Sequence, residues 1–214
     1  MRTRRLVRFT RPFEQGSVNG YVLDVGREFF VIALVSDHIR FDGFQALRVR
    51  DVRGLSDNPF AVFVESALKK RREHRPRKPM VNVRSLRELL LSAGRAFPLI
   101  TIHREKVDAS VCHVGRLVGV AKGRASILEI GPGASWDEAP TAYALKQITR
   151  VDFGGDYEDA LHIVGGDPPQ GNSGLQQTPT SRSLGRRVRV AGQSRRSRES
   201  GARAVRGVCR YEAV

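Results

Sequence analysis

Histidine and cysteine are the residue types of this chain that could bind a metal ion, and the candidates are His103, Cys112, His113 and His162. Cys112 and His113 are adjacent, so on a strand their side chains point to opposite faces and do not share an ion. The paired zinc spacings Cys-x-x-Cys and His-x-x-x-His are absent. The sequence therefore predicts no metal site and no cofactor, and it favours a buried Cys112 beside a surface His113.

Two further patterns could support catalysis. Cys112 would be a nucleophile only beside a base, and His103 on the preceding predicted strand is the candidate base. Paired carboxylates could do acid–base chemistry, but here they fall in a loop and at a predicted helix N-terminus, where capping and the helix dipole account for acidic residues. These carboxylates are Asp137, Glu138, Asp152, Asp156, Glu158 and Asp159. We predict that the chain has no catalytic residues and is not an enzyme.

The single tryptophan, Trp136, lies in a polar segment that runs from Gly131 to Pro140. Tryptophan is a frequent anchor of protein interfaces. The alternative is that its ring folds back over the adjacent strands. The sequence leaves both possibilities open, and Trp136, Asp137 and Glu138 are the predicted partner-binding residues.

The net charge of +15 is concentrated outside the predicted folded units. Residues 69–79 carry a net charge of +6 and residues 167–214 a net charge of +7, so the remaining segments are close to neutral. A dedicated nucleic-acid-binding protein usually clusters Lys and Arg on a folded face. The distribution therefore makes RNA binding the second hypothesis.

RNA binding would use the basic linker and the Arg-rich tail, with weak and strongly salt-dependent affinity. Arg48 and Arg50 are two residues apart, which places them on one face of a predicted strand. The candidate residues are Arg48, Arg50, Lys69, Lys70, Arg71, Arg72, Arg75, Arg77 and Lys78. The alternative for the linker is a solvated spacer between two folded units.

The elements that would position these residues are mostly short strands. Apolar and alternating segments predict five strands over residues 6–55, including the continuous apolar strand Phe29–Val35. A helix with one apolar stripe, Phe60, Phe63, Val64, Ala67 and Leu68, follows. Ser85 and Glu88 form a capping box that begins a second helix, and Gly94 is expected to end it. Five more strands and a final helix are predicted before Gly166.

The two sets of strands look like copies of one unit. Gly20–Val25 matches Gly115–Val120, and Val52–Leu55 matches Ile148–Val151 one residue out of phase. Such a repeat predicts a mainly β fold with two tandem small five-stranded barrels and short flanking helices. The expected organisation is a first barrel plus helix (1–68), a basic linker (69–83), a helix with the second barrel and a last helix (84–166), and a disordered Arg-rich tail (167–214).

Residues 100–166 resemble an uncharacterised bacterial family of tandem small β-barrels of the Sm-like type. The resemblance lies in four segments, Ile102–Val107, Val111–Arg116, Ser135–Pro140 and Ile148–Leu161. It covers most of the second unit and, more weakly, the first. It implies a fold and brings no established activity.

No apolar segment is long enough to span a bilayer, and the basic start is not followed by the apolar run of a secretory signal. Two cysteines, Cys112 and Cys209, are too few for a disulfide framework. We therefore expect a cytoplasmic protein without membrane insertion. The predicted function is a non-catalytic module that binds an unknown protein partner through barrel edges and the Trp136 loop, with RNA as the alternative partner. The oligomeric state is left open.

Overall fold

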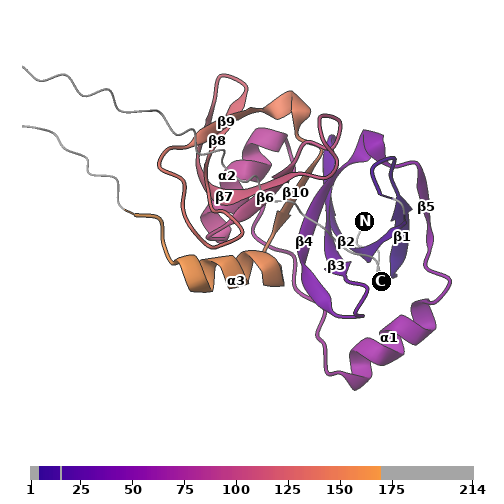
Figure 1. The fold of residues 1–214 in the computed structure, drawn as a ribbon. Coiled ribbons are helices and arrows are strands. Elements are labelled where there is room, and N and C mark those ends of the chain that lie inside the picture. Colours follow the sequence, from indigo (N-terminus) through magenta and orange to yellow (C-terminus); the bar gives the residue numbers. More distant parts are fainter. Residues whose placement is uncertain (1–4, 15, 170–214) are drawn as a thin grey trace, which may run out of the picture. The chain divides into compact units, whose positions relative to one another are not determined.

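The computed structural model describes residues 5–14 and 16–169 (Figure 1). The segment 170–214, which holds most of the predicted disordered tail and Cys209, lies outside the described residues. The described part is mainly β, with ten strands and three α-helices. The strands are β1 (Val7–Thr10), β2 (Val18–Val25), β3 (Phe29–Val35), β4 (Phe41–Arg48), β5 (Gly54–Asp57), β6 (Ile100–His103), β7 (Cys112–Ala121), β8 (Arg124–Glu129), β9 (Thr141–Ala144) and β10 (Arg150–Phe153). The helices are α1 (Ala61–Lys70), α2 (Leu86–Ala96) and α3 (Asp156–Gly165).

All ten strands belong to one antiparallel sheet, in the order β5-β1-β2-β3-β4-β10-β6-β7-β8-β9. The prediction of two closed five-stranded barrels is therefore wrong in that detail. The difference arises at β4 and β10, which pair through four registered residues, from Arg150↔Leu47 to Phe153↔Phe44. This pairing joins the strands of the first half to those of the second.

The two halves of the sheet have the same internal strand order, because β5-β1-β2-β3-β4 corresponds to β10-β6-β7-β8-β9. The register shifts after Val22 in β2 and after Leu117 in β7, each two residues beyond a glycine. A 3₁₀ turn precedes the last strand of each half, at Val49–Asp51 and Leu145–Gln147. Val52 and Ile148 directly follow these turns, as the sequence match predicts, and the one-residue offset relative to the Gly20–Gly115 match is present in the structure.

Each half buries an apolar face, but one of the cores is shared. The first half encloses Val7, Phe9, Val18, Phe30, Ile32 and Leu47. Alternate residues of β3 and β4, Phe29, Val31 and Ala46, point the other way and join the core of the second half. That core includes Ile102, Val151 and four residues of α2. The halves are thus held together by a common apolar cluster as well as by strand pairing.

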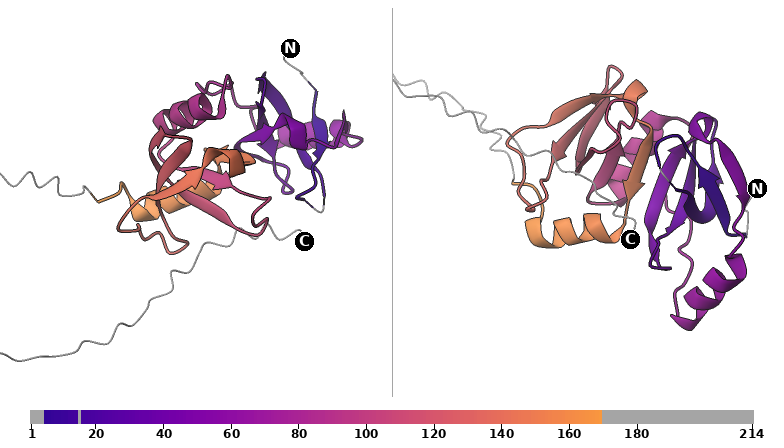
Figure 2. Two further views of the ribbon diagram at one scale, coloured as in Figure 1. Left: turned by 90° about the horizontal axis from the view of Figure 1, so that it is seen from above. Right: turned by 45° about the vertical axis from the view of Figure 1, so that its right-hand side comes forward.

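Helices α2 and α3 cover opposite faces of the second half (Figure 2). Ser85 begins α2 by accepting a hydrogen bond from the Glu88 amide (3.2 Å), as predicted. Gly94 does not end this helix: it lies inside α2, where a Cβ atom would come within 2.8 Å of Leu117 Cβ. On the other face, Leu161 of α3 packs with Leu99, Cys112 and Val114. Within the described residues, no helix has the length and apolar character needed to cross a membrane.

Candidate functional site

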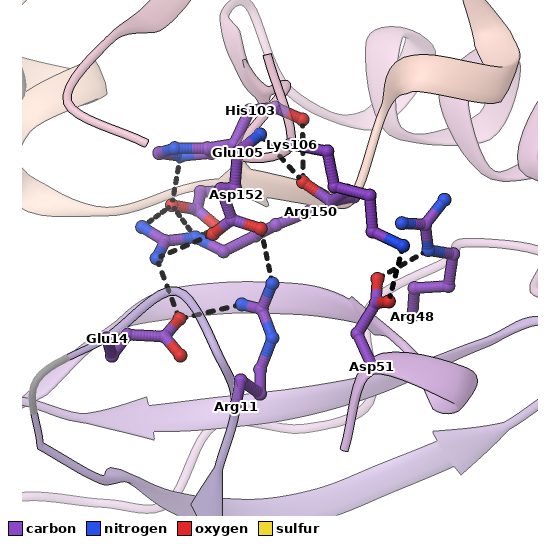
Figure 3. A network of polar contacts seen from close by, with 10 residues as sticks. Arg11, Glu14, Arg48, Asp51, His103, Glu105, Lys106, Arg150 and Asp152 are labelled. Carbon is purple, nitrogen blue, oxygen red and sulfur yellow. Dashed lines mark hydrogen bonds and ion pairs between the residues drawn. The ribbon is translucent and has the colours of Figure 1, made fainter. Parts of the chain in front are cut away.

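A buried network of charged residues lies where β4 and β10 meet (Figure 3). Its centre is Asp152 on β10, which accepts hydrogen bonds from Arg150 Nη2 (2.6 Å) and Nε (2.9 Å). The Nε2 atom of His103 on β6 lies 3.0 Å from the same carboxylate. Burial raises the pKa of Asp152, but the charge of Arg150 and the contact with His103 outweigh it and hold this pKa well below its usual range. Asp152 is therefore a permanent anion at neutral pH.

Residues from the first half of the chain complete the network. Arg11, just after β1, donates to Glu14 (2.8 Å) and to Glu105. Arg150 lies within 4 Å of the same two carboxylates, with Nη1–Oε1 distances of 3.8 Å to Glu14 and 3.9 Å to Glu105. Two arginines thus share three carboxylates. The contact between Arg11 and Glu105 joins residues 94 positions apart.

A second group of charges flanks this network and changes the interpretation of Arg48. Arg48 is buried and donates through Nε to Asp51 (2.5 Å), which also lies 3.4 Å from Lys106 Nζ. Arg50 is not on the same strand face, because β4 ends at Arg48 and Arg50 lies in the exposed 3₁₀ turn. The prediction that Arg48 and Arg50 share one strand face is therefore wrong: Arg48 is buried in an ion pair with Asp51.

This network has a structural role: it joins the two halves of the sheet where β4 pairs with β10, and we call it the junction. A charge without a partner is costly to bury, and here each buried cation faces a carboxylate. Burial lowers the pKa of His103, and the charge of Arg150 lowers it further, so the imidazole is neutral at pH 7. The Thr149 backbone, fully buried between the halves, accepts a hydrogen bond from Arg48 N (3.3 Å) and donates one to His103 O (2.9 Å). None of these side chains lines the hollow described below.

His113 forms a separate polar cluster with Glu129 and Tyr143. It is buried, so the prediction of a surface His113 is wrong. Arg104 Nη2 lies 3.1 Å from its Nε2, and Glu129 lies 3.0 Å from its Nδ1. Because the Arg104 guanidinium only donates, His113 Nε2 is the acceptor of that contact and Nδ1 is the donor toward Glu129. Burial raises the pKa of Glu129, but the hydrogen bonds from His113 and Tyr143 outweigh burial and lower it overall.

The proposed nucleophile Cys112 and its proposed base His103 do not form a common site. Cys112 and His103 are register partners in β7 and β6. The Cys112 side chain, however, packs among Leu99, Val114 and Leu161, whereas His103 contacts Asp152. Within residues 5–14 and 16–169, no group of three or more His, Cys, Asp or Glu side chains is placed to hold a metal ion.

The acidic residues at the start of α3 have structural partners. Glu158 is buried and accepts a hydrogen bond from the Thr101 hydroxyl. The amide of Asp156 donates to the Asp42 carboxylate (2.8 Å), so a side chain from β4 caps this helix. Asp152 belongs to the ion network. These carboxylates therefore have separate roles in the fold, and the cap of α3 comes from Asp42 rather than from the predicted Asp156 side chain.

The Trp136 loop lies against the second half. The Trp136 indole N–H donates to Gly165 O (3.2 Å), and the half-buried ring packs with the Ile130 and Leu161 cluster. The Asp137 amide donates to Glu129 O (2.9 Å), and Glu138 is exposed. Of the two possibilities left open by the sequence, this geometry corresponds to the ring that folds back on the strands.

The basic linker is anchored on the first half. Arg71 donates to Ile39 O (3.1 Å) and to His38 O, and the Arg75 guanidinium lies 4.8 Å from the centre of the Tyr21 ring. Lys78 pairs with Asp24 (2.6 Å). Lys69 and Lys70 belong to the last turn of α1. The remaining linker cations, Arg72 and Arg77, are exposed.

A hollow of about 570 Å³ opens between the linker and the first half. Tyr21, Phe41 and Leu68 form its apolar side, and the Tyr21 and Phe41 rings are 6.0 Å apart. Lys69, Arg72 and Arg75 contribute cations to its lining, together with Glu65, Glu73 and His74. The hollow thus combines aromatic rings with basic side chains.

An apolar surface lies at the end of the sheet, on β5 and α1. Leu55 of β5 is 65% exposed, and Phe60 and Phe63 are 67% and 63% exposed. The predicted apolar stripe of α1 is therefore only partly buried: Leu68 packs with Leu6 and Tyr21, whereas the two phenylalanines face solvent. Exposed phenylalanines this close to an edge strand are typical of interaction surfaces.

Several residues of these sites did not stand out in the sequence. Arg11, Glu14, Glu105 and Arg150 are ordinary charged residues there, and only the structure brings them together. One signal was present: Arg150 and Asp152 alternate with Val151 and Phe153, which places two opposite charges on one face of a short strand. Tyr21 and Phe41 had no signal, since apolar aromatics on strands are typical of a core.

Comparisons with family models, with curated proteins and with solved structures return no match for this chain. No relative therefore identifies a family for this chain.

Proposed function

We propose that this chain is a non-catalytic interaction module that binds an extended segment of a partner protein along β5. The observation that carries the proposal is the free edge of this strand. Within the described part of the chain, β5 pairs with β1 on one side and with no strand on the other. A free edge strand can accept a further strand through main-chain hydrogen bonds.

The hydrogen-bonding groups of β5 are arranged for such a contact. The Asn58 amide donates to Leu6 O (3.2 Å), and the register continues through Ser56↔Arg8. Because residues of an antiparallel pair alternate between facing toward and away from the partner strand, the amides of Leu55 and Asp57 face away from β1. A partner strand would pair with these two residues.

Exposed apolar side chains next to this edge would give the contact its affinity. Leu55 lies on the strand itself, and Phe60 and Phe63 follow at the start of α1. Large aromatic side chains that become buried in an interface are frequent energetic anchors. The Trp136 loop is less suited to this role, because its indole N–H already has an acceptor. The other edge, β9, is also less open, since Arg124 donates to Ala142 O (2.5 Å).

We further propose that the described part consists of two copies of one five-stranded unit of the Sm-like type. The repeated strand order, the register shift two residues after Gly20 and Gly115, and the 3₁₀ turn before each last strand support this proposal. In such an arrangement β5 occupies the place that β10 occupies in the second half. Because β10 pairs on both of its sides, a second partner for β5 is sterically reasonable.

The test uses a photo-reactive amino acid at position 55 or 63, with position 118 as a control on an exposed valine of β7. The partner cross-linked from positions 55 and 63 is purified, and its affinity is measured for the original chain, for Leu55→Ala and for Leu55→Pro. We expect Leu55→Pro to weaken binding about tenfold or more beyond Leu55→Ala, because proline also removes an outward amide. Equal affinity of the two variants would contradict strand addition.

A further inference from the structure

Helix α2 has no counterpart in the described part of the first half. The other two helices do correspond, because α1 and α3 each follow the last strand of their half. Helix α1 packs with Leu6 and Val35. Helix α3 packs with Leu99 and Ile130, which hold the same places in the repeated strand order. The two halves therefore differ by one helix.

In the second half, α2 covers the inner apolar face of the strands. Four of its apolar side chains, spaced i, i+3, i+4 and i+7, form one buried face of the helix. They belong to a single cluster with Ile148 and Val151, which are fully buried. Leu117, Val120 and Leu145 pack against the same cluster. This helix thus helps to remove the inner face of the second half from water.

Leu55 in the first half holds the place that Val151 holds in the second. The two are the second residues of β5 and β10. Their register partners, Phe9 and Ile102, belong to the apolar cores, so both side chains are on the inner face of their half. Val151 is completely buried, whereas Leu55 is 65% exposed. An apolar side chain that is covered in one half is therefore open in the other.

Two more positions show the same contrast. Val25 and Val120 correspond, because each lies three residues after the point where the register of its strand shifts. Val49 and Leu145 correspond, because each begins the 3₁₀ turn of its half. Val120 and Leu145 pack against the cluster that contains α2. Val25 and Val49 are 58% and 40% exposed.

The three exposed residues of the first half belong to one surface. Leu55 is the register partner of Phe9. Val25 is the register partner of Phe30, and the two phenylalanine rings are 5.1 Å apart. The Val49 amide donates to the residue just before β3 (2.9 Å), which places Val49 beside the β2–β3 turn. We call the surface formed by Val25, Val49 and Leu55 the open face.

The core of the first half fills only part of the space that α2 occupies in the second. Phe30 stands at the position of Ala125, since the two pair with corresponding valines of β2 and β7. The larger ring of Phe30 is itself buried, but it does not cover the open face. An apolar surface of this kind is typical of an interaction site.

Positive charge lies beside the open face. Arg50 and Arg53 are on the segment that joins Val49 to Leu55, and both are exposed. The adjacent carboxylate, Asp51, already has two cationic partners. Among residues 5–14 and 16–169, no carboxylate forms an ion pair with either arginine. Acidic side chains on a partner would complement these two cations.

From these observations we infer that the open face binds an acidic amphipathic helix of a partner protein, in the way that α2 covers the second half. The apolar stripe of that helix contacts Val25, Val49 and Leu55, and its carboxylates lie next to Arg50 and Arg53. Such helix-in-groove contacts use apolar residues at i, i+3, i+4 and i+7. The inference goes beyond the proposed function, which concerns the main-chain edge of β5 rather than a side-chain surface.

The experiment measures the anisotropy of a fluorescein-labelled peptide with the full chain. The peptide has the sequence of residues 84–97 with Arg84, Arg87 and Arg95 each replaced by glutamate, so it keeps the apolar face of α2 and is acidic. The unmodified peptide is the control for charge. A peptide of the same composition, with its leucines spread around the helix, is the control for the apolar stripe.

Two pairs of variants locate the peptide on the protein. Val25→Ser and Val118→Ser change valines that are 58% and 59% exposed, and only Val25 lies on the open face. Arg53→Glu and Lys122→Glu reverse the charge of exposed residues, and only Arg53 lies beside the open face. All four side chains are on the surface, so the variants are expected to fold.

We expect Val25→Ser to weaken binding about fivefold or more and Arg53→Glu about tenfold or more. Val118→Ser and Lys122→Glu should each change it less than about twofold. Equal losses within either pair would overturn the inference. Equal binding of either control peptide, or no binding at roughly 0.5 mM peptide, would also overturn it.

The two substitutions of Leu55 separate this inference from strand addition at β5. A helix contacts the side chain alone, so Leu55→Ala and Leu55→Pro should weaken peptide binding to the same extent. A larger loss in Leu55→Pro would assign the peptide to the strand edge and overturn the inference. Val25→Ser should leave the affinity of a partner strand at β5 unchanged, so either proposal can fail while the other stands.

Discussion

Asp152 is the residue on which the junction depends most directly. It is buried and contacts both Arg150 and His103. Removing one partner of a buried ion pair leaves the other charge without compensation, which is far more costly than losing a surface pair.

We therefore expect Asp152→Asn to lower the free energy of unfolding by about 3 kcal/mol or more, measured by urea denaturation. The control is Asp57→Asn, which breaks the exposed pair between Arg5 and Asp57 and should cost less than about 1 kcal/mol. Similar losses in the two variants would mean that the network contributes no more than a surface contact.

His103 gives the chain a pH dependence whose sign follows from its surroundings. Burial and the nearby Arg150 lower the pKa of this imidazole in the folded state, although Asp152 and Glu105 oppose them. The unfolded chain, with a pKa of about 6.5, takes up the proton first. Stability is therefore lost as the pH falls through the His103 pKa of the unfolded state, and the loss is complete below the lower pKa of the folded state.

The expected outcome concerns His103→Gln, which can still donate to Asp152 but does not titrate. The stability advantage of the original chain over this variant should shrink between about pH 7.5 and pH 5.5. Glu14 and Glu158, whose pKa values are raised chiefly by burial, act in the opposite direction but are present in both proteins. Urea titrations at several pH values measure the difference, and an advantage that stays constant would contradict the assignment.

Single helices and strands were predicted correctly where their structure depends only on residues close together in the sequence. β3 has the predicted limits Phe29–Val35, because a continuous apolar run of β-forming residues favours a buried strand. The Ser85 cap was also correct, since capping depends on residues three apart. The burial of the apolar stripe of α1 was not predicted correctly. An apolar stripe does not show whether another element packs on it, and Phe60 and Phe63 are exposed.

The two glycines of β7 provide a test of how closely the strands pack. A Cβ atom at Gly115 would lie 2.1 Å from Leu128 O, whereas at Gly119 it would meet nothing within 4 Å. We expect Gly115→Ala to lower the free energy of unfolding by about 2 kcal/mol or more, because backbone atoms must move to admit the methyl group. Gly119→Ala should change it by less than about 1 kcal/mol. Thermal denaturation of both variants checks the contrast.

For the molecule as a whole, the sequence predicted a mainly β fold but missed the continuity of the sheet. The pairing of β4 with β10 joins residues about 100 positions apart, and nothing in either strand distinguishes a free edge from a paired one. The charge network was missed for the same reason, since its members come from four separate segments. The candidate site residues Arg48, Arg50 and Trp136 were chosen by type, and their surroundings were not readable from the sequence.

The shared apolar cluster predicts that the two halves unfold together. Leu90 of α2 is fully buried in the cluster that also holds Phe29, Val31 and Ala46. We expect Leu90→Ala to lower the stability by about 2–5 kcal/mol. Native-state hydrogen exchange should then show equal losses of protection in β2–β3 and in β7–β8. A loss confined to the second half would mean that the halves are independent folding units.

The pairing of β4 with β10 also has a consequence during synthesis. When β4 has been made, the ribosome must still add about 100 residues before β10 is complete. At ordinary translation rates this takes roughly 5 to 20 seconds. During that interval the nascent first half carries an unpaired strand edge, the outward-facing Phe29 and Val31, and an Arg11 without Glu105. The protein is therefore most exposed to aggregation and to capture by chaperones before its last described strand has emerged.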